Sequence, residues 1–245
     1  MITSQYLIHL AIIHHGQYHK IKKALEEPPM QPPYLTQKAI TILDDCYPTR
    51  LKHLTQPPFV LFYEGNLDWL LYPSISIVGS RHPSDYAIQI LKEGFHYLNP
   101  KLAIVSGGAQ GIDGLAHECA LSHQMKTIWV CGHGLGRIYP KIHQRLYDTL
   151  KQDHLVISEY PFETQAFPQH FIHRNRIVVA LSDTCLVMSG LLQSGTMHSV
   201  KFALELNKNI VSIPHPINDV QGEICNHLIE NGSGLLTNVI EFAKL

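Results

Sequence analysis

The stretch LAIVSGGAQGIDGLAHECALSH, residues 102–123, decides the fold. An apolar run comes first, a glycine-rich turn follows, and the remaining residues place apolar side chains at helical spacing. A strand without polar alternation is buried on both faces, which is typical of a parallel sheet covered by helices. The stretch therefore predicts one strand, turn and helix unit of an α/β protein.

The same order of apolar run, glycine turn and helical segment recurs along the chain. The other apolar runs are SISIV at 74–78, TIWVC at 127–131, LVIS at 155–158, TCLVM at 184–188 and IVSIP at 210–214. Helical segments such as YAIQILKEGFHYL at 86–98 and MHSVKFALEL at 197–206 separate several of them. Alternating strands and helices predict an extended Rossmann-like, doubly wound fold with a mainly parallel sheet.

The first part of the chain differs from this pattern. Residues 1–44 contain short helical patterns divided by the proline-rich segment EEPPMQPPYLT at 26–36, which cannot continue a helix. A β-rich run, FVLFY at 59–63, then opens the repeating part. We therefore expect a small helical appendage over residues 1–44 and a Rossmann-like domain over residues 45–245.

Composition sets limits on the partners. The net charge of −1 over 245 residues means that a polyanion would have to bind a local basic groove rather than the field of the whole molecule. The five cysteines are scattered, which indicates free thiols in a reducing compartment, and no apolar run is long enough to span a membrane. We expect a cytoplasmic protein. The 17 histidines show no metal-ligand spacing, so neither a metal nor a cofactor is predicted.

Ligands of doubly wound folds bind beyond the carboxyl ends of the strands, so the loops there are the candidate site. The loop SGGAQGID at 106–113 has the spacing GGxxG rather than the dinucleotide pattern GxGxxG. Taken alone, it is compatible with phosphate binding and with tight packing. Four of the six arginines fall in or just before segments resembling loops or helix starts: Arg81, Arg137, Arg174 and Arg176. With Lys141 they predict a basic groove, although Arg174 and Arg176 could instead form internal ion pairs.

An ordered set of motifs resembles the DNA-processing protein A family, also called DprA or Smf. These motifs are GSR at 79–81, SGGAQGID at 106–113, GRIYP at 136–140, SEYP at 158–161, RNRI at 174–177, SGT at 194–196 and CNHLIENG at 225–232. The similarity covers roughly residues 47–240. Two details depart from many relatives: Ser189 replaces an acidic residue, and PHP stands at 214–216.

The resemblance implies a recombination mediator of natural transformation that binds single-stranded DNA, protects incoming strands without cutting them and helps to load RecA, usually as a homodimer. The glycine loop is then expected to receive a DNA phosphate or to leave room for a nucleotide. The expected DNA-binding residues are Gly79, Ser80, Arg81, Ser106, Gly107, Gly108, Gly111, Arg137, Lys141, Phe171, Arg174, Asn175 and Arg176. Phe171, Tyr139 and Phe167 could stack on bases or belong to the core.

Two other classes of function fit the sequence less well. The same Rossmann-like branch resembles nucleoside-monophosphate phosphoribohydrolases, but no carboxylate follows SGT at 194–196 to serve as acid or base. Helix capping or the helix dipole explains Asp113, and Glu159 could order an arginine. We therefore expect no enzyme and no catalytic residue. A pure protein-interaction scaffold would leave the clustered arginines without a purpose.

Overall fold

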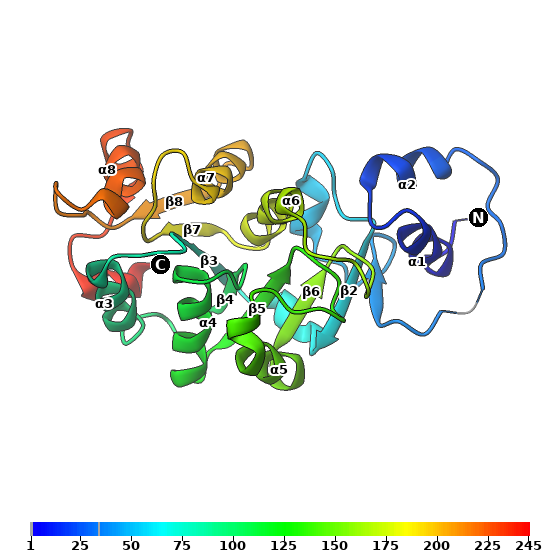
Figure 1. The fold of residues 1–245 in the computed structure, drawn as a ribbon, viewed down its shortest axis with the longest axis horizontal. Helices are drawn as coiled ribbons and strands as arrows, with labels where there is room; N and C mark the ends of the chain where they lie inside the picture. The colour runs from blue at the N-terminus through cyan, green and yellow to red at the C-terminus, as the bar shows by residue number, and fades with distance from the viewer. Residues whose placement is uncertain (1, 34) are drawn as a thin grey trace.

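A computed structural model of the chain describes residues 2–33 and 35–245, so Tyr34 of the proline-rich segment lies outside it. Within the described residues, nine strands form one sheet in the order β1-β2-β6-β5-β4-β3-β7-β8-β9 (Figure 1). The strands are β1 (Ala39–Thr41), β2 (Val60–Gly65), β3 (Ser74–Val78), β4 (Ala103–Ser106), β5 (Lys126–Cys131), β6 (Leu155–Ser158), β7 (Thr184–Val187), β8 (Asn209–Ser212) and β9 (Gly234–Leu235).

The sheet is parallel from β6 through to β9 and antiparallel only where β2 pairs with β1 and β6. This arrangement confirms the predicted fold class. The helices are α1 (Ser4–Ile13), α2 (Tyr18–Ala24), α3 (Asp85–Gly94), α4 (Ile112–Ser122), α5 (Gln144–Asp153), α6 (Pro168–Ala180), α7 (Gly195–Glu205) and α8 (Glu223–Glu230). Short 3₁₀ helices join them: η1 (Thr49–His53), η2 (Leu67–Leu71), η3 (Lys141–His143), η4 (Val220–Gly222) and η5 (Val239–Lys244).

Helices cover both faces of the sheet, as the uninterrupted apolar strands require. In Figure 1, α3, α4 and α5 lie on one face, while α6, α7 and α8 lie on the other. Strand β4 shows the reason: Ala103 and Val105 pack in the core beneath α6 and α7, whereas Ile104 packs against α3 and α4. Because successive side chains of a strand point to opposite faces, both faces need apolar residues.

The N-terminal segment combines helix and strand. Helices α1 and α2 lie at the end of the molecule opposite α8 (Figure 1). The hydroxyl of Ser4 donates to the carboxylate of Asp44 at 2.6 Å, which ties α1 to the turn that follows β1. Strand β1 belongs to the sheet through its pairing with β2, although its three residues give too short a signal to be recognised as a strand. The boundary at residue 44 stays a prediction.

The order of the strands reverses at β3, and this reversal leaves room for a ligand. The chain runs outward from β3 through β4, β5 and β6, then returns to β7 on the other side of β3. The loops after β3 and β7 therefore diverge, which leaves a crevice at the carboxyl ends of these two strands.

None of the helices in the described part has the length and hydropathy of a membrane span. Cys46 is exposed, and the other four cysteines are buried free thiols.

Candidate functional site

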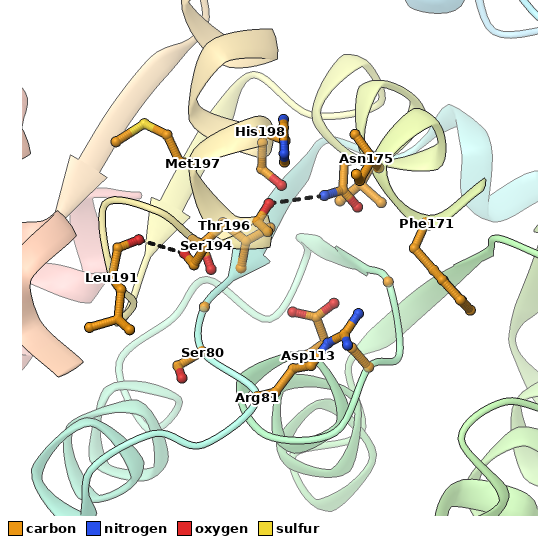
Figure 2. Close-up of a pocket in the computed structure, with 18 of the residues that line it drawn as sticks. Ser80, Arg81, Asp113, Phe171, Asn175, Leu191, Ser194, Thr196, Met197 and His198 are labelled. Atoms are coloured by element: carbon orange, nitrogen blue, oxygen red, sulfur yellow. Dashed lines mark hydrogen bonds between the residues drawn. The ribbon is translucent and has the colours of Figure 1, made fainter. Parts of the chain in front are cut away.

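A cavity of about 820 Å³ opens at this crevice. Its size falls within the range of small-molecule and cofactor sites. One wall carries the loops after β3 and β4, the second comes from α6, and the third is the segment from Leu191 to the first turns of α7. Figure 2 shows Arg81 and Asp113 on the first wall, across from Asn175, Thr196 and His198.

The loop after β3 is held in place by its backbone. The N–H of Ser80 donates to the hydroxyl of Ser189 at 3.1 Å, and its carbonyl accepts from the N–H of Ile112 at 3.1 Å. Ser189 thus joins the end of β7 to this loop. A Cβ at Gly79 would lie 2.6 Å from the Ile112 side chain. The loop presents an exposed Arg81 to the cavity, and this guanidinium forms no ion pair with a described residue.

The glycine loop after β4 packs against buried side chains. Gly107 reaches the cavity, but a Cβ there would meet the guanidinium of Arg174 at 2.4 Å. At Gly108, with φ of +66°, a Cβ would lie 1.8 Å from the indole of Trp129. The hydroxyl of Ser106 is fully buried and donates to the carbonyl of Ile77. Gly111 packs against the backbone of the loop after β3. Ser106, Gly108 and Gly111 do not line the cavity. The spacing of these glycines therefore serves close packing.

Arg174 supports the glycine loop from α6. It is 3% exposed, and its guanidinium donates to the carbonyls of Gly107 and Val130. Its Nε donates to the side-chain oxygen of Asn175 at 3.2 Å, and Asn175 in turn donates to the carbonyl of Gly195 at 3.4 Å. Both residues line the cavity. Arg174 thus donates to the glycine loop, to strand β5 and to Asn175, and its charge lies at the wall of the cavity.

Arg176 lies elsewhere. Its guanidinium binds the carboxylate of Glu159 at 2.7 and 2.9 Å, and both side chains are 4% exposed. Arg176 is absent from the lining of the cavity that Arg174 lines. Of the two alternatives that the sequence left open for Arg176, the structure has the internal ion pair. Arg176 is therefore not part of the proposed site.

The remaining expected residues surround the cavity unevenly. Phe171 lines it and packs against Tyr139, with ring centroids 5.1 Å apart. Arg137 lies outside the lining and pairs with Glu163 at 3.2 Å on the surface. Lys141 is exposed at the start of η3, also outside the lining. The structure thus brings together Gly79, Ser80, Arg81, Gly107, Phe171, Arg174 and Asn175 from the expected set.

The residues of the third cavity wall were not among the DNA-binding residues expected from the sequence. The segment Leu191–Ser199 and Lys201 lines the cavity from the loop after β7 and the start of α7. The motif SGT at 194–196 marked this loop, and the rule that ligands bind where the strand order reverses could have selected it. Lys201 is exposed and, like Arg81, forms no ion pair with a described residue.

Asp113 supplies the single carboxylate among the cavity-lining residues of the described chain. It occupies the first turn of α4, as expected for a residue that benefits from the helix dipole. Burial raises the pKa of its carboxyl to about 6, while the charge of Arg174, the N–H groups of Ala109 and Gly107, and the charge of Arg81 act in the opposite direction. Within the described residues, no three possible metal ligands cluster.

The fold and this cavity define an α/β protein with an arginine- and lysine-lined crevice at the switch point of a doubly wound sheet. The chain belongs to the DNA recombination-mediator protein A family, whose model matches residues 38–245. The resemblance drawn from the sequence motifs is thereby confirmed.

Two curated relatives show how far the similarity extends. The chain is 40% identical over 200 residues to DNA processing protein DprA of Streptococcus pneumoniae, covering 82% of this chain and 71% of that protein. It is 35% identical to Protein Smf of Synechocystis, covering 79% of this chain and half of that protein. The chain therefore matches only part of each relative.

Solved structures agree with the sequence comparison. The structure of DprA from Streptococcus pneumoniae matches with a TM-score of 0.81 over 83% of this chain and 72% of that one. DNA processing protein A from Helicobacter pylori, for which a single-stranded DNA binding mode is described, matches with a TM-score of 0.76 at 29% identity, over 85% of this chain and 95% of that one.

Proposed function

We propose that the cavity binds single-stranded DNA, and that the chain protects incoming strands and promotes RecA loading in natural transformation. The observation that carries this proposal is that Arg81 and Lys201, which form no ion pair with a described residue, lie on opposite walls of a cavity that aromatic rings also line. Cations bind phosphates without reading sequence, and the rings of Phe171 and Tyr139 offer faces on which unpaired bases stack.

Competition between single-stranded and duplex DNA tests this proposal. A labelled single strand bound to the protein is challenged with an unlabelled single strand or with a blunt duplex of the same length. We expect the single strand to compete far better, and strands of different sequence to compete about equally, because bases in a duplex cannot reach the rings. Equal competition by the duplex would contradict the proposal.

The protonation of Asp113 is expected to make DNA binding depend on pH. Above its pKa of about 6 the carboxylate is charged and repels phosphate, and below it the repulsion is lost. Affinity for a single strand should therefore rise about fivefold between about pH 8 and pH 5.5. The other ionisable side chains that line the cavity are those of Arg81, Arg174, Lys201, Tyr139, His82 and His198.

A matched pair of variants isolates this effect. Both carry His82→Gln and His198→Gln, and one also carries Asp113→Asn, so that only the carboxyl differs. Fluorescence anisotropy is measured at each pH at constant ionic strength. The rise in affinity should persist in the first variant and vanish in the second. A rise that survives Asp113→Asn would show that another group is responsible.

The wider role brings three further proposals: RecA as a partner, a homodimer as the working form, and a cytoplasmic location. Exposed apolar side chains in the C-terminal region, such as Ile217, Val220 and Leu235, support a dimer. Light scattering should give about twice the monomer mass of 27.7 kDa, and a monomer at micromolar concentration would contradict it. Co-precipitation with RecA and cell fractionation test the other two.

We also propose that the chain is not an enzyme. Glu159 is one of the two carboxylates that could serve in catalysis, but it forms an ion pair with Arg176 outside the cavity. Asp113 remains, and its raised pKa would suit a general base, but the cavity offers no second carboxylate within the described chain. Incubation with nucleoside monophosphates should release no free base, whereas steady release that is lost in Asp113→Asn would favour the phosphoribohydrolase alternative.

A further inference from the structure

The third wall of the cavity is the beginning of α7, and its first turn is open toward the cavity. No acidic residue occurs in this turn, and Ser194 makes no side-chain capping bond. Ser194 instead donates to the carbonyl of Leu191 at 2.6 Å. A Cβ at Gly195 would meet no atom within 4 Å, so the first turn has free space beside it. The N–H groups that begin a helix lack partners in the helix itself and carry a partial positive charge.

Two largely buried residues of the same helix carry hydroxyls that have no hydrogen-bond partner among the described residues. Thr196 is 6% exposed and Ser199 is 2% exposed, yet both line the cavity. Neither hydroxyl forms a hydrogen bond with another described residue, although both side chains are more than nine-tenths buried. They stand three residues apart and so share one face of α7. Neither oxygen is among the enclosed polar atoms that lack a partner, so both hydroxyls are open to the cavity that their residues line and can donate to a ligand there.

Charges nearby favour an anion as that ligand. Lys201 follows on α7, and Arg81 lies on the opposite wall, both without an ion pair among the described residues. The side-chain amide of Asn175 holds the carbonyl of Gly195, which fixes this turn against α6. Glu223 outside the cavity accepts the N–H of Leu192 at 3.0 Å and so orders the loop that leads into α7.

We propose that the first turns of α7 form a phosphate subsite, in which Thr196 and Ser199 donate their hydroxyls and Lys201 supplies charge. It deepens the proposed function and rests on it for the identity of the ligand as nucleic acid. The phosphate could be an internal phosphodiester of the strand or a phosphate at its 5′ end. Both present anionic oxygens that accept hydrogen bonds from hydroxyl and N–H groups.

Removal of the two hydroxyls tests the subsite without changing the charge. Thr196→Val and Ser199→Ala are combined, and Thr149→Val with Ser122→Ala, at positions outside the cavity, provides the matched control. The probes are thymidine 5′-monophosphate, inorganic phosphate, and an oligothymidine with or without a 5′ phosphate. Hydrogen bonds to charged groups are strong, so we expect each lost hydroxyl to weaken phosphate-bearing probes about tenfold.

Salt dependence separates this effect from a loss of charge. The neutral double variant should bind the oligonucleotide more weakly but with an unchanged slope of log affinity against log salt, because no cation has been removed. Circular dichroism melts check that the variant is folded as the control is. Stronger binding of the 5′-phosphorylated strand by the wild-type protein would assign the subsite to the strand end, and equal binding would assign it to a phosphodiester.

The outcomes distinguish the subsite from the proposed function. Unchanged affinity of the folded double variant for all the probes would overturn the subsite and leave single-strand binding intact. Weaker binding of thymidine 5′-monophosphate alone, by a protein whose wild type binds no single strand, would support the subsite and overturn the proposed function. Weaker binding of both classes of probe supports the two together.

Discussion

Replacing both Arg81 and Lys201 with alanine is expected to weaken binding of single-stranded DNA about 100-fold at moderate salt, with the fold unchanged. Both residues line the cavity from opposite walls, and neither is held in an ion pair with a described residue. The slope of log affinity against log salt is negative, and each lost phosphate contact should make it shallower by about 0.7, so the slope of the double variant should be shallower by about 1.4. Binding isotherms over a series of salt concentrations give both quantities.

Controls remove equal charge at other places. Arg145→Ala with Lys101→Ala removes two exposed cations that lie outside the cavity lining, and both affinity and slope should stay close to wild type. Lys141→Ala should weaken binding less than Arg81→Ala, because Lys141 also lies outside the lining. If Arg81→Ala/Lys201→Ala binds like the control pair while its thermal melt is unchanged, the DNA site lies elsewhere on the surface.

Substitution of Gly108 by alanine is expected to give the largest loss of stability, about 4 kcal/mol. The new Cβ would lie 1.8 Å from an atom of Trp129. Trp129 is fully buried and stacks on His117 at 5.2 Å between ring centroids, so it cannot move aside without disturbing the core. A backbone φ of +66° adds strain for any residue with a side chain.

Two other glycines separate the steric clash from the backbone strain. Gly232 has φ of +87° with nothing within 4 Å of a new Cβ, so Gly232→Ala should show the strain alone, about 1–2 kcal/mol. Gly195 has neither constraint, and Gly195→Ala should leave stability unchanged or raise it by up to about 1 kcal/mol. Urea unfolding measures all three. Similar losses for Gly108→Ala and Gly232→Ala would show that contact with Trp129 costs little.

The repeating order of strands and helices was predictable because each strand is buried on both faces. Runs such as LAIV at 102–105 therefore lack polar residues, and their order predicts a parallel sheet. The antiparallel strand β1 was not predictable, since three residues carry no periodicity that distinguishes a strand from a loop. Its place depends on pairing with β2, which is a contact between distant segments.

The candidate site was predictable as a set of loops but not residue by residue. Arg174 and Arg176 look alike in the motif RNRI, yet the helical rotation of α6 sends one to the glycine loop and the other to Glu159. The glycine loop itself proved to pack on Trp129 and Arg174, a contact between separate segments that spacing does not reveal. The wall formed by α7 required the strand order, which no local pattern contains.

Photo-cross-linking of a bound strand tests most directly whether the cavity is the DNA site. A single strand with 5-iodouracil in place of thymine reacts on irradiation with aromatic side chains that its bases touch, and mass spectrometry identifies the modified peptides. We predict cross-links to Phe171 and Tyr139, which line the cavity, and their loss in Arg81→Ala/Lys201→Ala. Cross-links confined to aromatic residues outside the cavity, such as the exposed Tyr97 that follows α3, would contradict the assignment.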